Sequence, residues 1–393
     1  MRKLFRSTIL LLILAALPAA ANLCRAEDPQ PTPATEALKD NMAVVYEAFK
    51  NLQKYMYNRD TFVDPANDQE IAAILKSLGG GVHRIGLTGS KYREDPGFSS
   101  TLTILNQMLD DSQKRFAEGK KGYALWRLKT SANYCVSCHT RYEVKADFSD
   151  SDIDLSKLNY YEQGEFYLAS RQFEKAKNAY LAAVLDPNLP FIRMDALRKW
   201  LIIYVRVYSD PQAAITQINK LRPRAKFSRY EEDEIVGWLE SLRRWQNEGA
   251  VRVPPIAKAE NLLRQGLGMN DPLSRKKGTV ELLRATAILH HLLEDQSPEA
   301  QAQRSHALYL LGVAYSELPF FFVNELPELF LEQVIHEFPG SEDAKNAFGL
   351  YREIVTLGYT GSGGTRIPEE AQQSLRELHD LAYGVPQVGK SKA

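Results

Sequence analysis

Apolar residues recur at every third or fourth position over residues 36–58, which predicts an amphipathic helix with one buried face. Thr35 precedes this helix and is its expected N-cap. A second, short helix should begin at Asp68 and end at the three glycines Gly79 to Gly81, because glycine weakens a helix interior. Two further helices are expected from Leu102 to Phe116 and from Tyr123 to Lys145. The stripe on the first helix is Met42, Val45, Tyr46, Phe49, Leu52 and Met56.

The fourth expected helix carries reactive side chains in its apolar stripe. Cys135 and His139 lie on the same face as the apolar residues, because positions three or four apart share one side of a helix. Four helices over 36–145 with such a site are typical of a bundle built around a buried cofactor. The stripe consists of Leu128, Ala132, Cys135, His139 and Tyr142.

The second half of the chain is expected to be helical as well. Residues 146–157 are acidic and serine-bearing, which predicts a linker, and residues 158–384 carry helical periodicity. Around Gly164 and Tyr180 the spacing is similar to that of a tetratricopeptide repeat, in which a small residue lets two helices touch and aromatic side chains fill the gap. A second, irregular candidate repeat spans 307–339. The sequence thus predicts an all-α fold, with a four-helix bundle followed by a TPR-like α-solenoid.

The two ends of the chain have the composition of processed or mobile segments. Residues 1–26 resemble a cleavable signal peptide, because a basic start precedes an apolar run that is too short to span a bilayer. Cys24 raises the alternative of a lipid-anchored cysteine, although the bulky Leu23 before it disfavours lipidation. Residues 27–35 are rich in proline and are expected to form a flexible leader. Residues 385–393 are expected to be a disordered tail. The sequence therefore predicts an exported, periplasmic protein.

Composition adds little and excludes some partners. Lysine plus arginine and aspartate plus glutamate number 49 each, so the chain has no basic excess of the kind that nucleic-acid binding favours. No other apolar run approaches the length of a membrane span. Hydrophobic residues make up 44% of the chain and charged residues 25%, which is ordinary for a soluble globular protein.

The residues Cys135-Val136-Ser137-Cys138-His139 form the motif C-x-x-C-H, which is the attachment signature of a c-type haem. In this chemistry the two thiols bond the porphyrin and the histidine is the proximal iron ligand. Once residues 1–26 are removed, Cys135 and Cys138 are the only cysteines left, so the motif predicts one haem c per chain. A zinc site, a thioredoxin-like redox pair and a small disulfide loop are the alternatives. Each fits less well. The zinc site lacks an evident fourth ligand, the redox pair lacks the strands of its usual setting, and the disulfide would close a very small loop within a helix.

The place of the motif at the end of a fourth helix resembles cytochrome c′ and its low-spin relatives. The local sequence Cys-Val-Ser-Cys-His-Thr-Arg-Tyr also has the aromatic residue that this family usually places three positions after the histidine. The resemblance covers about residues 36–145 and implies a haem-binding four-helix bundle. Class I cytochromes c, whose motif lies near the N-terminus, are disfavoured.

The resemblance leaves the sixth iron ligand open. Low-spin relatives supply a methionine from the first helix, which in this sequence would be Met42, whereas cytochrome c′ itself leaves the position vacant beside an apolar residue. A gap-filling methionine in the core is the alternative for Met42. The second ring nitrogen of His139 should donate to a carbonyl, a carboxylate or water. Arg141 and Tyr142 are candidate haem contacts.

Two classes of function follow from this sequence. The first is electron transfer or small-gas binding, with the helical-repeat region docking a redox or other protein partner. The second is a haem enzyme of peroxidase-like type, which calls for a polar distal group, and no distal histidine or arginine can be assigned. A haem that only stabilises the fold is a third reading. The sequence favours a protein that is not an enzyme. It does not fix the oligomeric state, and a homodimer is compatible with it.

Overall fold

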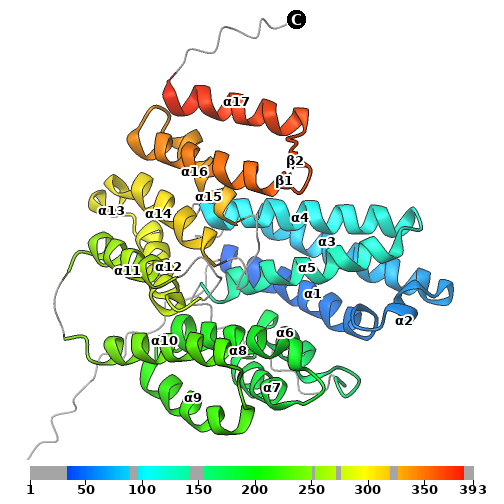
Figure 1. Cartoon of the computed structure of the whole chain (residues 1–393). Helices are drawn as coiled ribbons and strands as arrows, with labels where there is room; N and C mark the ends of the chain where they lie inside the picture. Colours follow the sequence, from blue (N-terminus) through cyan, green and yellow to red (C-terminus); the bar gives the residue numbers. More distant parts are fainter. Residues whose placement is uncertain are drawn as a thin grey trace, which may run out of the picture.

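The computed structural model describes residues 33–88, 96–141, 154–249, 253–270, 276–318 and 326–384, and these are α-helical apart from one short hairpin and the connecting turns (Figure 1). The predicted all-α class is confirmed. None of the described helices is long and apolar enough to cross a membrane. The expected signal peptide and the expected C-terminal tail lie outside the described residues.

Four long helices make up the first part of the chain. Helix α1 packs on α3, α3 on α4, and α4 on α5 (Figure 1). The end of α5 thereby shares a pocket with the middle of α1 and the second half of α3. The elements are α1 (Pro33–Met56), α2 (Arg59–Val63), the 3-10 turn η1 (Pro65–Asn67), α3 (Asp68–Leu87), α4 (Pro96–Ala117) and α5 (Lys121–His139).

The triple glycine does not end a helix, so that expectation is wrong. Helix α3 continues through Gly79 to Gly81 and ends at Leu87. At Gly81 a Cβ atom would lie 2.8 Å from Cγ2 of Val45 on α1. This glycine therefore serves the close approach of α1 and α3, and that gain in packing outweighs the low helix propensity of the segment. His83, which follows the three glycines, is an exposed residue of α3.

Two helix boundaries also differ from expectation. Helix α1 begins at Pro33, so Thr35 lies inside the helix and the leader is shorter than predicted. Proline is well suited to a first turn because its missing N–H has no partner there in any case. Helix α5 ends at His139 rather than at Lys145. Just after its end, the Thr140 hydroxyl donates to the Val136 carbonyl oxygen at 2.8 Å.

The second part of the chain is a succession of helices in which neighbours pack on one another (Figure 1). The first elements are α6 (Tyr160–Ala169), α7 (Phe173–Leu185), the 3-10 turn η3 (Pro190–Ile192), α8 (Arg193–Ile202), the π-helical turn η4 (Ile203–Val207), α9 (Pro211–Ala225) and α10 (Arg229–Gln246). The later elements are α11 (Pro255–Met269), α12 (Thr279–Glu294), α13 (Pro298–Ala302), α14 (Arg304–Ser316), α15 (Leu326–Glu337), α16 (Glu342–Gly358), the strands β1 (Thr360–Gly361) and β2 (Gly364–Thr365), and α17 (Glu369–Tyr383).

Small residues bring the paired helices of this region together, as the sequence predicts. A Cβ atom on Gly164 of α6 would lie 2.5 Å from the Tyr180 ring of α7. The same holds for Gly312 of α14, where a Cβ atom would lie 2.5 Å from Leu331 of α15. Each contact admits glycine only, because a larger residue would force the helices apart.

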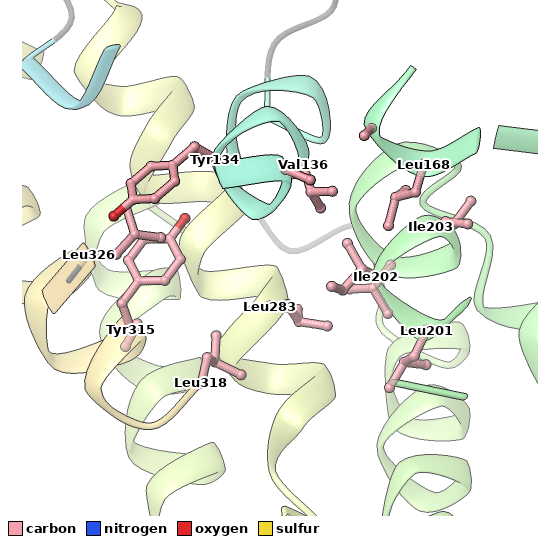
Figure 2. Close-up of a cluster of buried hydrophobic side chains, with 14 of the residues drawn as sticks. Tyr134, Val136, Leu168, Leu201, Ile202, Ile203, Leu283, Tyr315, Leu318 and Leu326 are labelled. Atoms are coloured by element: carbon pink, nitrogen blue, oxygen red, sulfur yellow. The ribbon is translucent and has the colours of Figure 1, made fainter. Parts of the chain in front are cut away.

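One continuous hydrophobic core joins the two parts of the chain. The Phe49 ring of α1 stacks on Phe166 of α6 with 5.6 Å between ring centroids. Figure 2 shows Tyr134 of α5 beside Tyr315 of α14, and Val136 on the side of α5 that faces Leu168. Helix α5 is thus covered on one side by helices from the second half of the chain. Of the expected linker 146–157 only 154–157 is described, and Leu155 there is buried.

Candidate cofactor site

A pocket lies where the C-terminal ends of α5 and α6 meet the middle of α1 and α4 and the second half of α3. Its empty space amounts to about 490 Å³, a volume that includes the open mouth and the solvent there. Three residues singled out in the sequence, Met42, Cys135 and His139, line it together. Most of the remaining wall is apolar and comprises Val45, Phe49, Leu78, Val82, Leu105, Leu109 and Ala132.

Helix α5 places the two cysteines differently. Cys135 lies one turn before His139, so both face the pocket, whereas Cys138 is half-buried at the edge of that face and is not part of the described wall. Burial raises the pKa of the Cys135 thiol to about 12, and the neighbouring Cys138 thiol adds to the rise. Cys135 is therefore a protonated thiol at neutral pH.

The thiols bear on two of the alternatives for the motif. A redox-active cysteine has a lowered pKa, because the thiolate is the reactive form, whereas the pKa of Cys135 is raised. No group of three or more His, Cys, Asp or Glu side chains able to hold a metal ion occurs in the part of the chain that the structure describes. Cys135 and Cys138 are not joined by a disulfide.

The His139 ring is held by the main chain of α6. Its Nδ1 lies 2.5 Å from the carbonyl oxygen of Ala169. A carbonyl can only accept, so Nδ1 carries the proton and Nε2 keeps the lone pair that binds a metal. One ring nitrogen of His139 thus has a carbonyl partner of the kind expected, and ligation of iron by the other stays a prediction.

The charge state of His139 also suits metal binding. Burial, and secondarily the positive charge of Arg171, lower its pKa to about 4, against the weaker opposite effect of the Ala169 bond. The imidazole is therefore neutral at pH 7, with Nε2 available. Its protonated, non-binding form appears only in acid.

The turn between α6 and α7 completes this arrangement. The Arg171 guanidinium donates from Nη1 to the backbone carbonyl oxygen of His139 at 3.1 Å. Arg171 has a φ of 63°, a conformation that non-glycine residues seldom adopt. Ala169 and Ser170 line the pocket itself. Sequence reasoning missed these residues, because a main-chain acceptor 30 residues from the motif has no signature of its own.

The methionines of the first four long helices differ in whether they line the pocket. Met42 lines the pocket and is half-buried, whereas Met56 and Met108 are buried away from the wall. The Met56 sulfur accepts from Gln53 Nε2 at 3.8 Å, within helix α1. Met42 therefore borders the same pocket as His139, and its ligation of iron stays a prediction.

Arg141, a predicted haem contact, also interacts electrostatically with residues of the second half of the chain. Arg141 is buried. The pKa of His290 on α12 is lowered first by the burial of His290 and next by the positive charge of Arg141. The charge of Arg141 also contributes to lowering the pKa of Arg206 on η4. Arg141 thus interacts with helices of the second half of the chain, and contact with haem stays a prediction for it. Tyr142 lies outside the described residues.

The two adjacent histidines of α12 have different surroundings. His290 is buried, with Nε2 2.7 Å from the Tyr315 hydroxyl oxygen, whereas His291 is exposed. The two side chains do not converge on a common ligand.

No protein-family model matches this chain, and neither a curated protein nor a solved structure matches it. The resemblance to cytochrome c′ therefore rests on the motif and its position in the chain.

Proposed function

We propose that this chain is an exported c-type cytochrome with one haem, attached through Cys135 and Cys138, that acts in electron transfer or small-gas binding. The observation that carries the proposal is the His139 ring, neutral and with Nδ1 bonded to Ala169, in the pocket that Cys135 and Met42 also line. In this proposal α1, α3, α4 and α5 form a haem-binding four-helix bundle.

The residues present fit a haem. Two thiols stand at the required spacing on α5, and a neutral imidazole with Nε2 available follows them. The apolar wall from α1, α3 and α4 would cover the porphyrin and exclude water. Bound haem would supply an iron centre that exchanges an electron or binds a diatomic gas.

The chain's own residues would set the properties of that centre. The Ala169 carbonyl orients the His139 ring and increases its basicity, as outer-shell acceptors do for metal-ligating histidines. Arg171 fixes the position of the His139 main chain. Because Ala169 and Arg171 belong to the second half of the chain, a TPR-like array that docks a protein partner would also be in direct contact with the proximal ligand.

A spectrum tests the function and separates its alternatives. The protein, exported in a strain that attaches haem, is expected to show the α band of a c-type cytochrome when reduced. Ready binding of carbon monoxide would indicate gas binding, and resistance to it would indicate electron transfer. Peroxidase activity that follows haem content would favour the enzyme alternative. A reduced spectrum without haem bands contradicts the proposal.

A further inference from the structure

Two turns in the second half of the chain lie against each other. One joins α7 to α8 at residues 186–193, and the other comprises the end of α9 and the start of α10 at residues 222–230. Arg193 connects them, because its Nη1 donates to the carbonyl oxygens of Ala225 at 2.9 Å and Lys226 at 3.4 Å. Helix α9, which leads into the second turn, lies at the lower edge of the molecule in Figure 1. The two turns therefore form one continuous part of the surface.

The first turn exposes a large apolar side chain. Phe191, in the 3-10 turn η3, is 97% exposed, the largest exposed fraction among the bulky hydrophobic residues that the structure describes. Pro190 beside it is exposed as well, and Tyr230 on the second turn is 70% exposed. Single apolar residues are ordinary on protein surfaces, so the surroundings of Phe191 decide whether it has a role.

The two turns carry an excess of positive charge. Together they contain five basic residues and one acidic residue, Asp186. The Asp186 carboxylate is directed to its own turn, where it accepts from the backbone N–H of Asn188 at 2.9 Å and from the Asn188 side chain at 3.0 Å. The basic residues are Arg193, Arg222, Arg224, Lys226 and Arg229.

The acidic residues that follow the second turn neutralise only part of this charge. Glu232 pairs with Arg222 at 2.6 Å. Glu231 accepts from the backbone N–H of Ser228 at 2.7 Å and so completes the cap of α10. Three basic residues of the second turn are exposed and form no ion pair with any residue that the structure describes, and these are Arg224, Lys226 and Arg229.

We propose that these two turns bind the surface of a membrane that contains anionic phospholipid, with Phe191 inserted between the headgroups. A bilayer presents anionic phosphates above a hydrocarbon layer, and this surface offers cations to the first and an exposed aromatic ring to the second. Long basic side chains reach phosphates while their stems lie along apolar material. An acidic protein would match the cations equally well, but Phe191 would then need a pocket in that partner. This binding goes beyond the proposed haem function and does not require haem.

Sedimentation of the full exported chain with vesicles tests this binding. The wild type should bind vesicles of phosphatidylglycerol but not of phosphatidylcholine, and added salt should weaken the binding because it screens exposed charges. Phe191→Ser should weaken the binding at least about tenfold, because the aromatic ring no longer enters the bilayer. Arg224→Gln combined with Lys226→Gln should weaken it roughly 25-fold, at about fivefold for each charge.

The control variants change the same chemistry elsewhere on the surface. Leu357→Ser removes an apolar side chain that is 72% exposed on α16. Lys39→Gln combined with Lys76→Gln removes two exposed charges from α1 and α3. Neither change should affect vesicle binding.

Several results would overturn the inference. These are equal binding to both lipids, binding to neither, and losses in the control variants as large as those in the test variants. Binding to soluble polyglutamate that matches binding to phosphatidylglycerol, and that Phe191→Ser leaves unchanged, would indicate an acidic protein partner instead. If a test variant does not fold, amide hydrogen exchange of the wild type is compared with and without phosphatidylglycerol vesicles. Exchange that vesicles do not slow in residues 186–193 and 222–230 also overturns the inference.

Discussion

Removal of the Arg171 side chain should weaken the hold of the protein on His139, the proposed proximal ligand. Arg171 donates to the His139 carbonyl oxygen at 3.1 Å, and its charge is the second cause, after burial, of the low pKa of that histidine. Arg171→Met removes the donor and the charge while keeping an unbranched side chain. Arg171→Gly removes them as well and also relieves the backbone, because φ at this position is 63°.

The two variants should differ in stability by a predictable amount. Loss of one hydrogen bond costs about 1 kcal/mol, so Arg171→Met should lower the free energy of unfolding by about that much. A left-handed backbone costs a non-glycine residue roughly 1–2 kcal/mol, which Arg171→Gly recovers. We therefore expect Arg171→Gly to be about as stable as the wild type and Arg171→Met to be the weaker variant in denaturant titrations.

Both variants should release the proximal ligand at higher pH than the wild type. Arg171 disfavours the protonated imidazole, so its removal raises the pKa of His139 and lets a proton compete better with iron for Nε2. Acid titration of the haem spectrum measures the midpoint of this release. Lys175→Met is the matched control, because Lys175 lies on α7 and donates to Gln172 rather than to His139.

Two results would refute this reasoning. The first is an acid midpoint that does not move in either Arg171 variant, which would mean that the guanidinium does not influence the imidazole. The second is an equal loss of stability in Arg171→Gly and Arg171→Met, which would mean that the backbone at this turn stores no strain. If the acid midpoint moves as far in Lys175→Met as in the Arg171 variants, the shift comes from general surface charge and not from Arg171.

Two further predictions concern the distal ligand and the division of the chain. Met42→Leu nearly conserves side-chain volume and should cost under about 1.5 kcal/mol in packing. If Met42 ligates the iron, this substitution should abolish the low-spin spectrum and the near-infrared sulfur-to-iron band. An unchanged spectrum excludes Met42 as ligand. The fragment 27–150 should unfold at lower denaturant than the full chain, because it lacks Phe166, which stacks on Phe49, and the Ala169 acceptor. Equal stability of fragment and full chain would show that the second half does not support the site.

The sequence was informative where a short local pattern determines structure. The stripe from Met42 to Met56 predicted the buried face of α1, and the spacing of Cys135 and His139 placed both at one pocket. Gly164 was correctly paired with Tyr180, because a tight helix contact requires a small residue opposite a large one.

The sequence misled, or was silent, where a distant segment decides the outcome. The glycines at 79–81 indicated a helix end by propensity, but the approach of Val45 from α1 gives Gly81 a packing role. The Ala169 acceptor is a main-chain oxygen, which every residue type has, so the sequence could not predict its contact with His139. The stripe on α1 included Tyr46 as a core residue, but which members of a buried face border a cavity depends on the helices opposite.

The mass of the mature protein tests the cytochrome assignment most directly. Exported from a strain competent in cytochrome c maturation, the chain should have lost its N-terminal segment and gained the mass of one haem that acidified acetone cannot extract. Cys135→Ala should lose most of this addition, because Cys135 is one of the two cysteines proposed to attach the haem. A polypeptide of unmodified mass from such a strain would contradict the account.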